Sequence, residues 1–267
     1  MANFIVQFPL ITEKYQEYIL DKRFEIGRKI YNSLVTVTQK RYKEMIKTKQ
    51  YRSIKEELKD IYSSTSKENT KHKKKLCALL NDLYKQYRVS EYSFHKDVKQ
   101  MQKHFKNNID SYTSQKIAST LWKSYEKLFF GNGNKIHYKK YNSLNSLEGK
   151  SNKTGIRFKD DCLLWNGLNI PVLIDYDNYY EYQAMQNEIA YCRIVRKFIR
   201  NKYKYYLQIV FKGATPVKVD KYTGKIKHQL GVGDVGIDIG TSTVAISSKS
   251  DVKILELADK VQNIENK

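Results

Sequence analysis

Residues 236–247 read GIDIGTSTVAIS and place one aspartate, Asp238, at the end of an apolar run that only small residues follow. The alternation in VGIDI and TVAIS predicts two strands joined by a tight turn, VKILEL predicts a third strand, and ADKVQNIENK begins like a helix. A carboxylate at the end of a strand, next to small side chains, is typical of a site that binds a metal ion or approaches a phosphate. Asp238 is therefore the first candidate for chemistry.

Three interpretations of this stretch compete. In a ribonuclease H-like nuclease core, the aspartate of the first strand holds two divalent ions together with later carboxylates. In a sugar-kinase or actin-like ATPase core, a similar DIGTS hairpin binds phosphate. In the third interpretation, Asp238 only accepts backbone hydrogen bonds in a structural turn. A kinase core begins with such a hairpin, whereas residues 1–235 precede it here, so its position disfavours the second interpretation.

The charge of the chain indicates a polyanionic partner. Its 267 residues carry 49 Lys and Arg against 28 Asp and Glu, a net charge of +21, and 22 tyrosines accompany these cations. Tyrosine stacks on bases while Lys and Arg hold phosphates, although tyrosine also fills half-buried strands and helix faces. Nucleic acid is therefore the expected partner.

Several other classes of protein are disfavoured. No apolar run is long enough to span a bilayer, and MANFIVQFPLITEKY lacks the features of a secretory signal, so we expect a cytoplasmic protein without a membrane partner. The three cysteines, Cys77, Cys162 and Cys192, lie far apart and outside any C-x-x-C pair. This spacing argues against a disulfide framework and against a zinc site.

The pattern of apolar and polar residues divides the chain into four segments. Residues 1–13 hold a first strand, and residues 14–130 show helical periods, with helices expected to start at Ser90 and after Ser114. Residues 131–230 change to short β-rich runs and end in a hydrophilic linker. Residues 231–267 carry the Asp238 stretch and are too few to close a compact domain.

Within the β-rich segment, IAYCRIVRKFI and KYYLQIVFKG predict a hairpin that turns at Arg200-Asn201-Lys202. In its second strand, Tyr205, Leu207, Ile209 and Phe211 alternate with more polar positions. This period of two predicts a sheet with one buried face.

Four stretches, in this order, resemble the N-terminal half of the TnpB, or OrfB-type, family. They are RFEIGRKIYNSL, WKSYEKLFFGNGNKIHYKKYNSLNSLEGKSNKTGIRF, YYLQIVF and GIDIGTSTVAIS. Members of this family are transposon-encoded, RNA-guided DNA endonucleases related to type V CRISPR effectors and often labelled transposases. The resemblance covers nearly the whole chain; it is strongest from Trp122 to Phe158 and in the last hairpin, and weakest in the helical stretch.

The resemblance implies an α+β fold in which a wedge-like antiparallel β-barrel is interrupted by a helical recognition bundle and followed by the start of a RuvC, ribonuclease H-like domain. Asp238 matches the first RuvC carboxylate, a catalytic residue and a Mg²⁺ ligand. The family's later carboxylates and its zinc-binding insert fall beyond Lys267. Glu256 follows Asp238 too closely to replace the second carboxylate, and Asp259 and Glu265 lie in a stretch expected to be an exposed helix. We therefore expect no DNA cleavage by these 267 residues alone, and Mg²⁺ binding only with the missing carboxylates.

The resemblance also implies that the chain holds a guide RNA and its duplex with target DNA through the sugar-phosphate backbone. The candidate contacts in the first helix are Arg23, Arg28, Lys29 and Arg41. Those in the β-rich segment are Tyr138, Lys139, Lys140, Tyr141, Lys150, Lys153, Arg157 and Lys159. Each lysine, taken alone, is more typical of a solvated surface charge, whereas the clustering of the lysines favours a binding role for the group.

The sequence therefore favours an RNA-guided DNA-binding protein of TnpB type, with the rest of the nuclease as a possible second polypeptide. One alternative is a non-catalytic, general nucleic-acid-binding protein whose DIGTST turn is structural. The other is a remnant of a kinase or ATPase-like fold.

Overall fold

A computed structural model describes residues 2–63, 70–131, 133–220, 223–226, 234–249 and 251–256. These residues form a mixed α+β protein with antiparallel sheets. The contacts divide the chain into two compact units, Met1–Pro216 and Val217–Lys267, and we describe each by itself.

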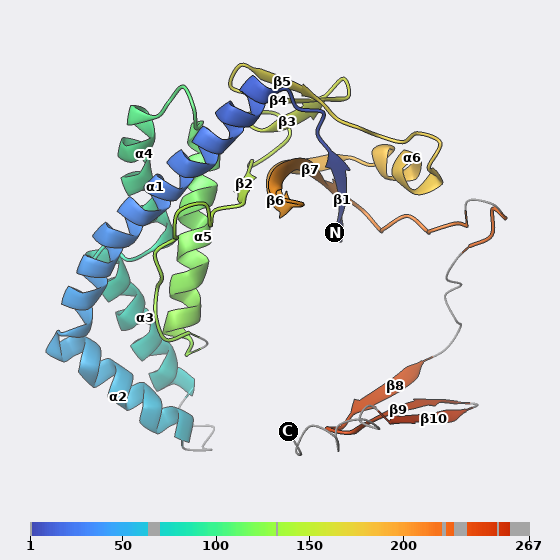
Figure 1. Cartoon of the computed structure of the whole chain (residues 1–267). Helices are drawn as coiled ribbons and strands as arrows, with labels where there is room; N and C mark the ends of the chain where they lie inside the picture. The colour runs from blue at the N-terminus through green and yellow to red at the C-terminus, as the bar shows by residue number, and fades with distance from the viewer. Residues whose placement is uncertain are drawn as a thin grey trace, which may run out of the picture. The chain divides into compact units, whose positions relative to one another are not determined.

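The helical part of the first unit comprises α1 (Lys14–Ile46), α2 (Lys49–Ser63), α3 (Thr70–Gln86), α4 (Glu91–His104) and α5 (Ser111–Phe129). The long helix α1 extends from the strands at its first turns to α2 at its end, and α5 packs against it (Figure 1). Its buried face consists of apolar side chains three and four residues apart, including Leu20, Phe24 and Leu34, all fully buried.

Two helix starts follow from side-chain caps. Ser90 caps α4, as predicted, because its Oγ accepts a hydrogen bond from the Ser93 amide at 3.3 Å. The next helix, α5, begins at Ser111 rather than after Ser114. Asp110 causes this difference, because one of its carboxylate oxygens accepts hydrogen bonds from the amides of Tyr112 and Thr113 at 2.9 and 3.0 Å.

A four-stranded sheet in the order β1-β7-β6-β2 brings the two ends of the first unit together. It consists of β1 (Asn3–Pro9), β2 (Ser146–Glu148), β6 (Ile189–Ile199) and β7 (Lys202–Lys212). The hairpin of β6 and β7 confirms the sequence prediction, with Arg200 and Asn201 at φ angles of 49° and 62°, as in a two-residue hairpin turn. Leu207, Ile209 and Phe211 are fully buried, which confirms the predicted apolar face.

A second sheet contains β3 (Arg157–Lys159), β4 (Cys162–Trp165) and β5 (Leu168–Pro171). A single bridge between Leu10 and Val172 links it to the end of β1. The wedge-like β-barrel implied by the resemblance is not formed by the described strands, because the four-stranded and the three-stranded sheet of the first unit are both open. The short helix α6 (Tyr179–Met185) separates β5 from β6, so the segment is not purely β as its texture suggested.

Arg23, Trp165 and Asp110 join the helices to the second sheet. The Arg23 guanidinium stacks on the Trp165 ring at 4.5 Å and donates to the carbonyls of Trp165 and Asn166 at 2.8 and 2.7 Å. The Trp165 indole N–H donates to Asp110 at 2.8 Å, on the same carboxylate that caps α5. Gly155 permits this approach, because its φ is +70° and a Cβ there would lie 2.7 Å from Asp110 Oδ1. We call Arg23, Asp110 and Trp165 the hub.

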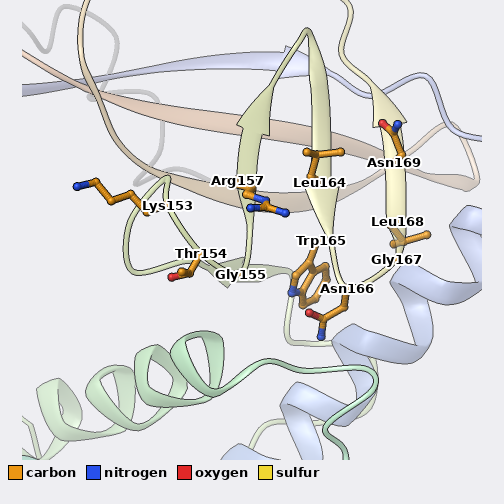
Figure 2. A pocket seen from close by; sticks show the side chains of 10 residues that line it. All are labelled: Lys153, Thr154, Gly155, Arg157, Leu164, Trp165, Asn166, Gly167, Leu168 and Asn169. Atoms are coloured by element: carbon orange, nitrogen blue, oxygen red, sulfur yellow. The ribbon is translucent and has the colours of Figure 1, made fainter.

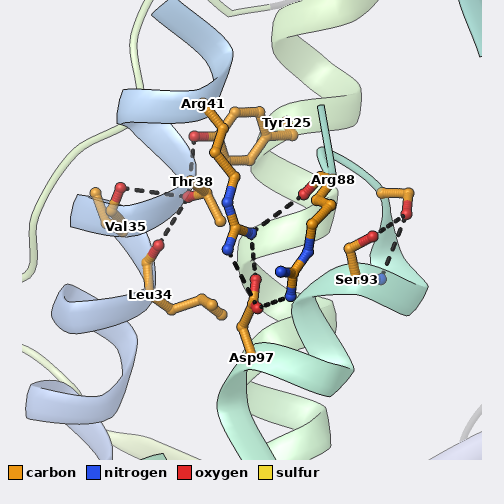
Figure 3. A network of polar contacts seen from close by, with 9 residues as sticks. Leu34, Val35, Thr38, Arg41, Arg88, Ser93, Asp97 and Tyr125 are labelled. Atoms are coloured by element: carbon orange, nitrogen blue, oxygen red, sulfur yellow. Dashed lines mark hydrogen bonds and ion pairs between the residues drawn. The ribbon is translucent and has the colours of Figure 1, made fainter. Parts of the chain in front are cut away.

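A second polar network holds the far half of α1 (Figure 3). Asp97 of α4 forms ion pairs with both Arg41 of α1 and Arg88, which precedes α4. In the same region, the Tyr125 hydroxyl of α5 donates to Thr38 Oγ1 at 3.0 Å. Burial raises the pKa of Tyr125 to about 12, so the hydroxyl stays protonated and remains a donor. These contacts fix α1 against α4 and α5.

The second unit contains a three-stranded antiparallel sheet of β8 (Val235–Ile239), β9 (Thr243–Ser248) and β10 (Val252–Glu256). These strands confirm the expected hairpin and third strand around Asp238. The apolar side chains of β8 and β10 are open to solvent, since Ile237 is 62% exposed and Ile254 is 66% exposed, whereas those of β9 are half-buried. The expected helix after VKILEL, with Asp259 and Glu265, lies outside the described residues.

The hub should contribute measurably to stability. Asp110→Ala removes the cap of α5 and leaves the buried Trp165 N–H without its acceptor, so we expect a loss of about 2–4 kcal/mol in the free energy of unfolding. Denaturant titration followed by circular dichroism measures this loss. Asp177→Ala, at an exposed site, is the matched control and should change stability by less than about 0.5 kcal/mol. Equal stability of the two variants would contradict the assigned role of Asp110.

Candidate nucleic-acid interface

Residues 136–141, which we call the strap, lie along α1 and carry four of the predicted site residues. Asn32 of α1 bonds to both backbone groups of Lys139: its amide donates to the carbonyl at 2.9 Å, and its oxygen accepts from the N–H at 2.8 Å. Gln39 donates to the Ile136 carbonyl at 3.0 Å, and the Ile136 side chain is buried. The backbone of the strap is therefore fixed alongside α1.

The strap side chains at positions 137, 138, 140 and 141 are exposed, whereas the strap backbone bonds to the helix. Tyr138 is 50% exposed and Tyr141 is 73% exposed, and Lys140 is also exposed. The Lys139 ammonium is half-buried and lies 5.0 Å from the centre of the Tyr31 ring. Neither lysine forms an ion pair with a described residue. Positive charge and aromatic surface thus occur side by side without neutralisation.

A stripe of exposed cations runs along α1 next to the strap. Lys22, Lys29 and Lys40 are separated by seven and eleven residues, which corresponds to about two and three helical turns, so they lie on one line. All three are exposed, and none forms an ion pair within the described part of the chain. At about 1.5 Å per residue, the stripe is about 27 Å long. The sequence prediction named only Lys29 of this set, although the spacing contains the signal.

The predicted arginines of α1 have other partners. Arg23 is 3% exposed, and burial lowers its pKa to about 10, against the opposing effect of Asp110, so it stays protonated at neutral pH inside the hub. Arg28 donates to Glu25 and to the Lys139 carbonyl, and Arg41 pairs with Asp97. Their guanidinium groups hold the fold together, whereas Lys22, Lys29 and Lys40 are exposed and form no ion pair with a described residue.

A cavity of about 530 Å³ lies beside the hub, and two further predicted residues, Lys153 and Arg157, stand at its rim (Figure 2). Trp165 and the turn at Asn166 and Gly167 form part of its wall. Both cations are exposed and lack an ion pair among the described residues. Besides the strap lysines, two further predicted cations lie apart from the cavity lining: the Lys150 ammonium is 5.8 Å from the centre of the Tyr112 ring, and Lys159 pairs with Asp160.

Asp238 lies in β8 of the second unit and is exposed. In the strand register it is level with Ala245 of β9 and Ile254 of β10, so Glu256 shares its face but lies two strands away and two residues farther along. The residues level with Asp238 in the other two strands, Ala245 and Ile254, carry no carboxylate. No group of three or more metal-binding side chains occurs among the described residues. The described residues therefore do not fit a two-ion Mg²⁺ site.

Comparison with known proteins adds no assignment. No protein-family model matches the chain, and no curated protein matches it. Within the described parts, no helix is long and apolar enough to cross a lipid bilayer.

The strap should depend on Asn32. In Asn32→Ala, the Lys139 N–H loses its acceptor, and we expect its hydrogen exchange to accelerate by about tenfold. Exchange measured at single-residue resolution by NMR tests this, with Ser33→Ala, an exposed position on the same turn, as the control. Unchanged protection of Lys139 in Asn32→Ala would show that the strap is held by other contacts.

Proposed function

We propose that the chain is a nucleic-acid-binding protein that holds an RNA backbone along the α1 stripe and the strap. The observation that carries this proposal is the line of Lys22, Lys29 and Lys40 beside Tyr138, Lys140 and Tyr141, exposed and without ion pairs among the described residues. Such a line suits a phosphate backbone, because each cation releases a counterion when it meets a phosphate.

The strap gives the proposed interface its second component. Tyrosine rings next to lysines accept stacked bases while the cations hold phosphates. Because Asn32 and Gln39 fix the strap backbone, the tyrosines lose little conformational freedom when a ligand binds. Lys153 and Arg157, at the rim of the cavity beside the hub, offer a separate binding site for phosphate. The interface is proposed from exposed lysines and tyrosines of the first unit; among them, the Tyr138 hydroxyl shares a 3.3 Å hydrogen bond with Thr36 of α1.

The specific form that we propose is a TnpB-type protein that holds a guide RNA and its duplex with target DNA. Its support is the ordered resemblance of RFEIGRKIYNSL, the Trp122–Phe158 stretch and GIDIGTSTVAIS to that family. The proposal includes a wedge-like arrangement of the first unit's strands, a RuvC domain that starts at Asp238, and a cytoplasmic location. Cleavage would require Mg²⁺ and carboxylates other than those described, supplied by a further part of the nuclease or by a second polypeptide.

A general nucleic-acid-binding protein with a structural DIGTST turn is the second candidate. It is favoured by the exposure of Asp238 and by the absence of a second carboxylate near it in the described strands. The two candidates differ in the RNA that co-purifies. A TnpB-type protein should retain one structured RNA, whereas a general binder should retain a mixture.

The proposed interface makes a quantitative prediction for salt dependence. In the triple variant Lys29→Gln, Lys40→Gln, Lys140→Gln, the slope of log affinity for RNA against log salt should become shallower by about 2, because each lost phosphate contact removes about 0.7 to 0.9. Fluorescence anisotropy over a range of salt concentrations measures this slope.

The control triple variant is Lys14→Gln, Lys85→Gln, Lys212→Gln. It removes the same net charge, but these lysines pair with Glu17, Asp82 and Glu188. Its slope should stay near that of the wild type, and Asp238→Ala should bind RNA as the wild type does. If both triple variants changed the slope equally, binding would depend on net charge alone, and the α1 stripe would not be the interface.

A further inference from the structure

The outward face of the β1-β7-β6-β2 sheet carries cations and tyrosines. On the inward face, Cys192, Ile194 and Leu207 are fully buried in the core. Their neighbours Arg193, Val195 and Tyr206 alternate to the outward face. Three lysines that extend this outward set are exposed and form no ion pair with any described residue: Lys197, Lys202 and Lys204. The face therefore has unneutralised charge.

Two of these lysines lie directly opposite each other. Lys197 of β6 and Lys204 of β7 are register partners in the hairpin. Like charges at directly opposite positions of adjacent strands destabilise a sheet. An anion bound between the two ammonium groups would remove this repulsion. The pair therefore points to an anionic ligand.

Two tyrosines provide flat surface on the same face. The Lys197 ammonium lies 5.2 Å from the centre of the Tyr206 ring, and the Lys116 ammonium lies 5.1 Å from that of Tyr191. Both rings are partly exposed. A ring beside a cation is the arrangement that receives a stacked base and its phosphate.

A ladder of polar side chains crosses the four strands between these tyrosines. Glu148 of β2 accepts from Arg193 at 2.6 Å, Arg193 donates to Gln208 at 3.3 Å, and Gln208 donates to Gln7 at 3.2 Å. Burial would raise the pKa of Glu148, but hydrogen bonds from Lys116 and Arg193 hold it below its usual value, so the carboxylate stays charged. The ladder presents amide groups that can bond to base edges.

A cavity of about 430 Å³ connects this face with the strap. Its lining includes Tyr31 and Lys139 on the strap side, Lys116 on α5, and Glu148, Arg193 and Val195 on the sheet. The lining carries three cations and one acid, so it favours an anionic occupant. A nucleic-acid strand bound at the strap could therefore reach the sheet through a positively charged cavity.

We propose that the outward face of this sheet, together with the adjoining cavity, binds a single-stranded stretch of nucleic acid. Tyr206 and Tyr191 stack on bases, and Lys197 and Lys204 hold phosphates. The proposal rests on the proposed function and adds to it a single-strand site that is distinct from the α1 stripe. A flat, cationic, aromatic surface suits unpaired bases, because paired bases do not expose their faces.

The test compares short oligouridine, oligothymidine of the same length, and a duplex by fluorescence anisotropy. We expect Tyr206→Leu to weaken single-strand binding by about tenfold, since stacking on one ring contributes about 1–3 kcal/mol per base, and to leave duplex binding unchanged. Tyr206→Phe should bind as the wild type does. Tyr92→Leu is the matched control, because Tyr92 on α4 is exposed and has the Lys96 ammonium 4.6 Å from its ring.

The double variant Lys197→Gln, Lys204→Gln gives an independent readout. It should weaken single-strand binding and should also raise the thermal stability of the free protein, because the repulsion is removed. A loss seen mainly with oligouridine identifies RNA as the ligand, and a loss mainly with oligothymidine identifies DNA. If both Tyr206→Leu and the double variant kept the single-strand affinity of the wild type, this proposal would be overturned, and the proposed function would still be supported by duplex binding. If the wild-type protein bound no nucleic acid at all, the proposed function would be overturned as well.

Discussion

The buried stack of Arg23 on Trp165, with Asp110 as the acceptor of the indole N–H, is the constraint on which the first unit depends. It ties together three segments that are far apart in sequence: α1, the start of α5 and the β4–β5 turn. A buried guanidinium is costly unless its donors are satisfied, and two carbonyls accept from its terminal nitrogens, while Nε has no partner among the described residues. The geometry of the hub therefore permits little variation in how the helices meet the strands.

This constraint also separates the cations of α1 into two groups. The arginines at positions 23, 28 and 41 face the body of the unit, where planar donors suit carbonyls and carboxylates. The lysines at positions 22, 29 and 40 face solvent on a helix that is fixed near both ends, by the hub and by Asp97. A rigid line of free ammonium groups results, next to tyrosines whose backbone is also fixed. We attribute the proposed nucleic-acid binding to this rigidity together with the charge, because charge alone would not specify a surface.

Local features of the fold were predictable from sequence, whereas long-range partners were not. The β6–β7 hairpin follows from alternation and from its Arg200-Asn201 turn, and the α4 cap follows from Ser90. The helix α2 received no bounds of its own within the predicted helical segment 14–130, although Tyr51, Ile54, Leu58 and Ile61 recur three and four residues apart and pack in one cluster. Arg23 was expected to contact nucleic acid, because nothing near it in the sequence reveals that Trp165 lies beneath it. Of the candidate site, exposed Tyr138, Lys140 and Tyr141 were named from sequence, but Tyr206 and Lys197 required the strand register.

Photochemical crosslinking of bound RNA, with crosslinked residues identified by mass spectrometry, tests the central claim most directly. The central claim is that RNA lies along α1 and the strap, so crosslinks should concentrate at Tyr138 and Tyr141. Tyr62 of α2 and Tyr92 of α4 are at least as exposed as Tyr138 and each has a lysine ammonium near its ring, so they report non-specific contact. Crosslinks that concentrated at Tyr62 and Tyr92 and spared the strap would contradict the account.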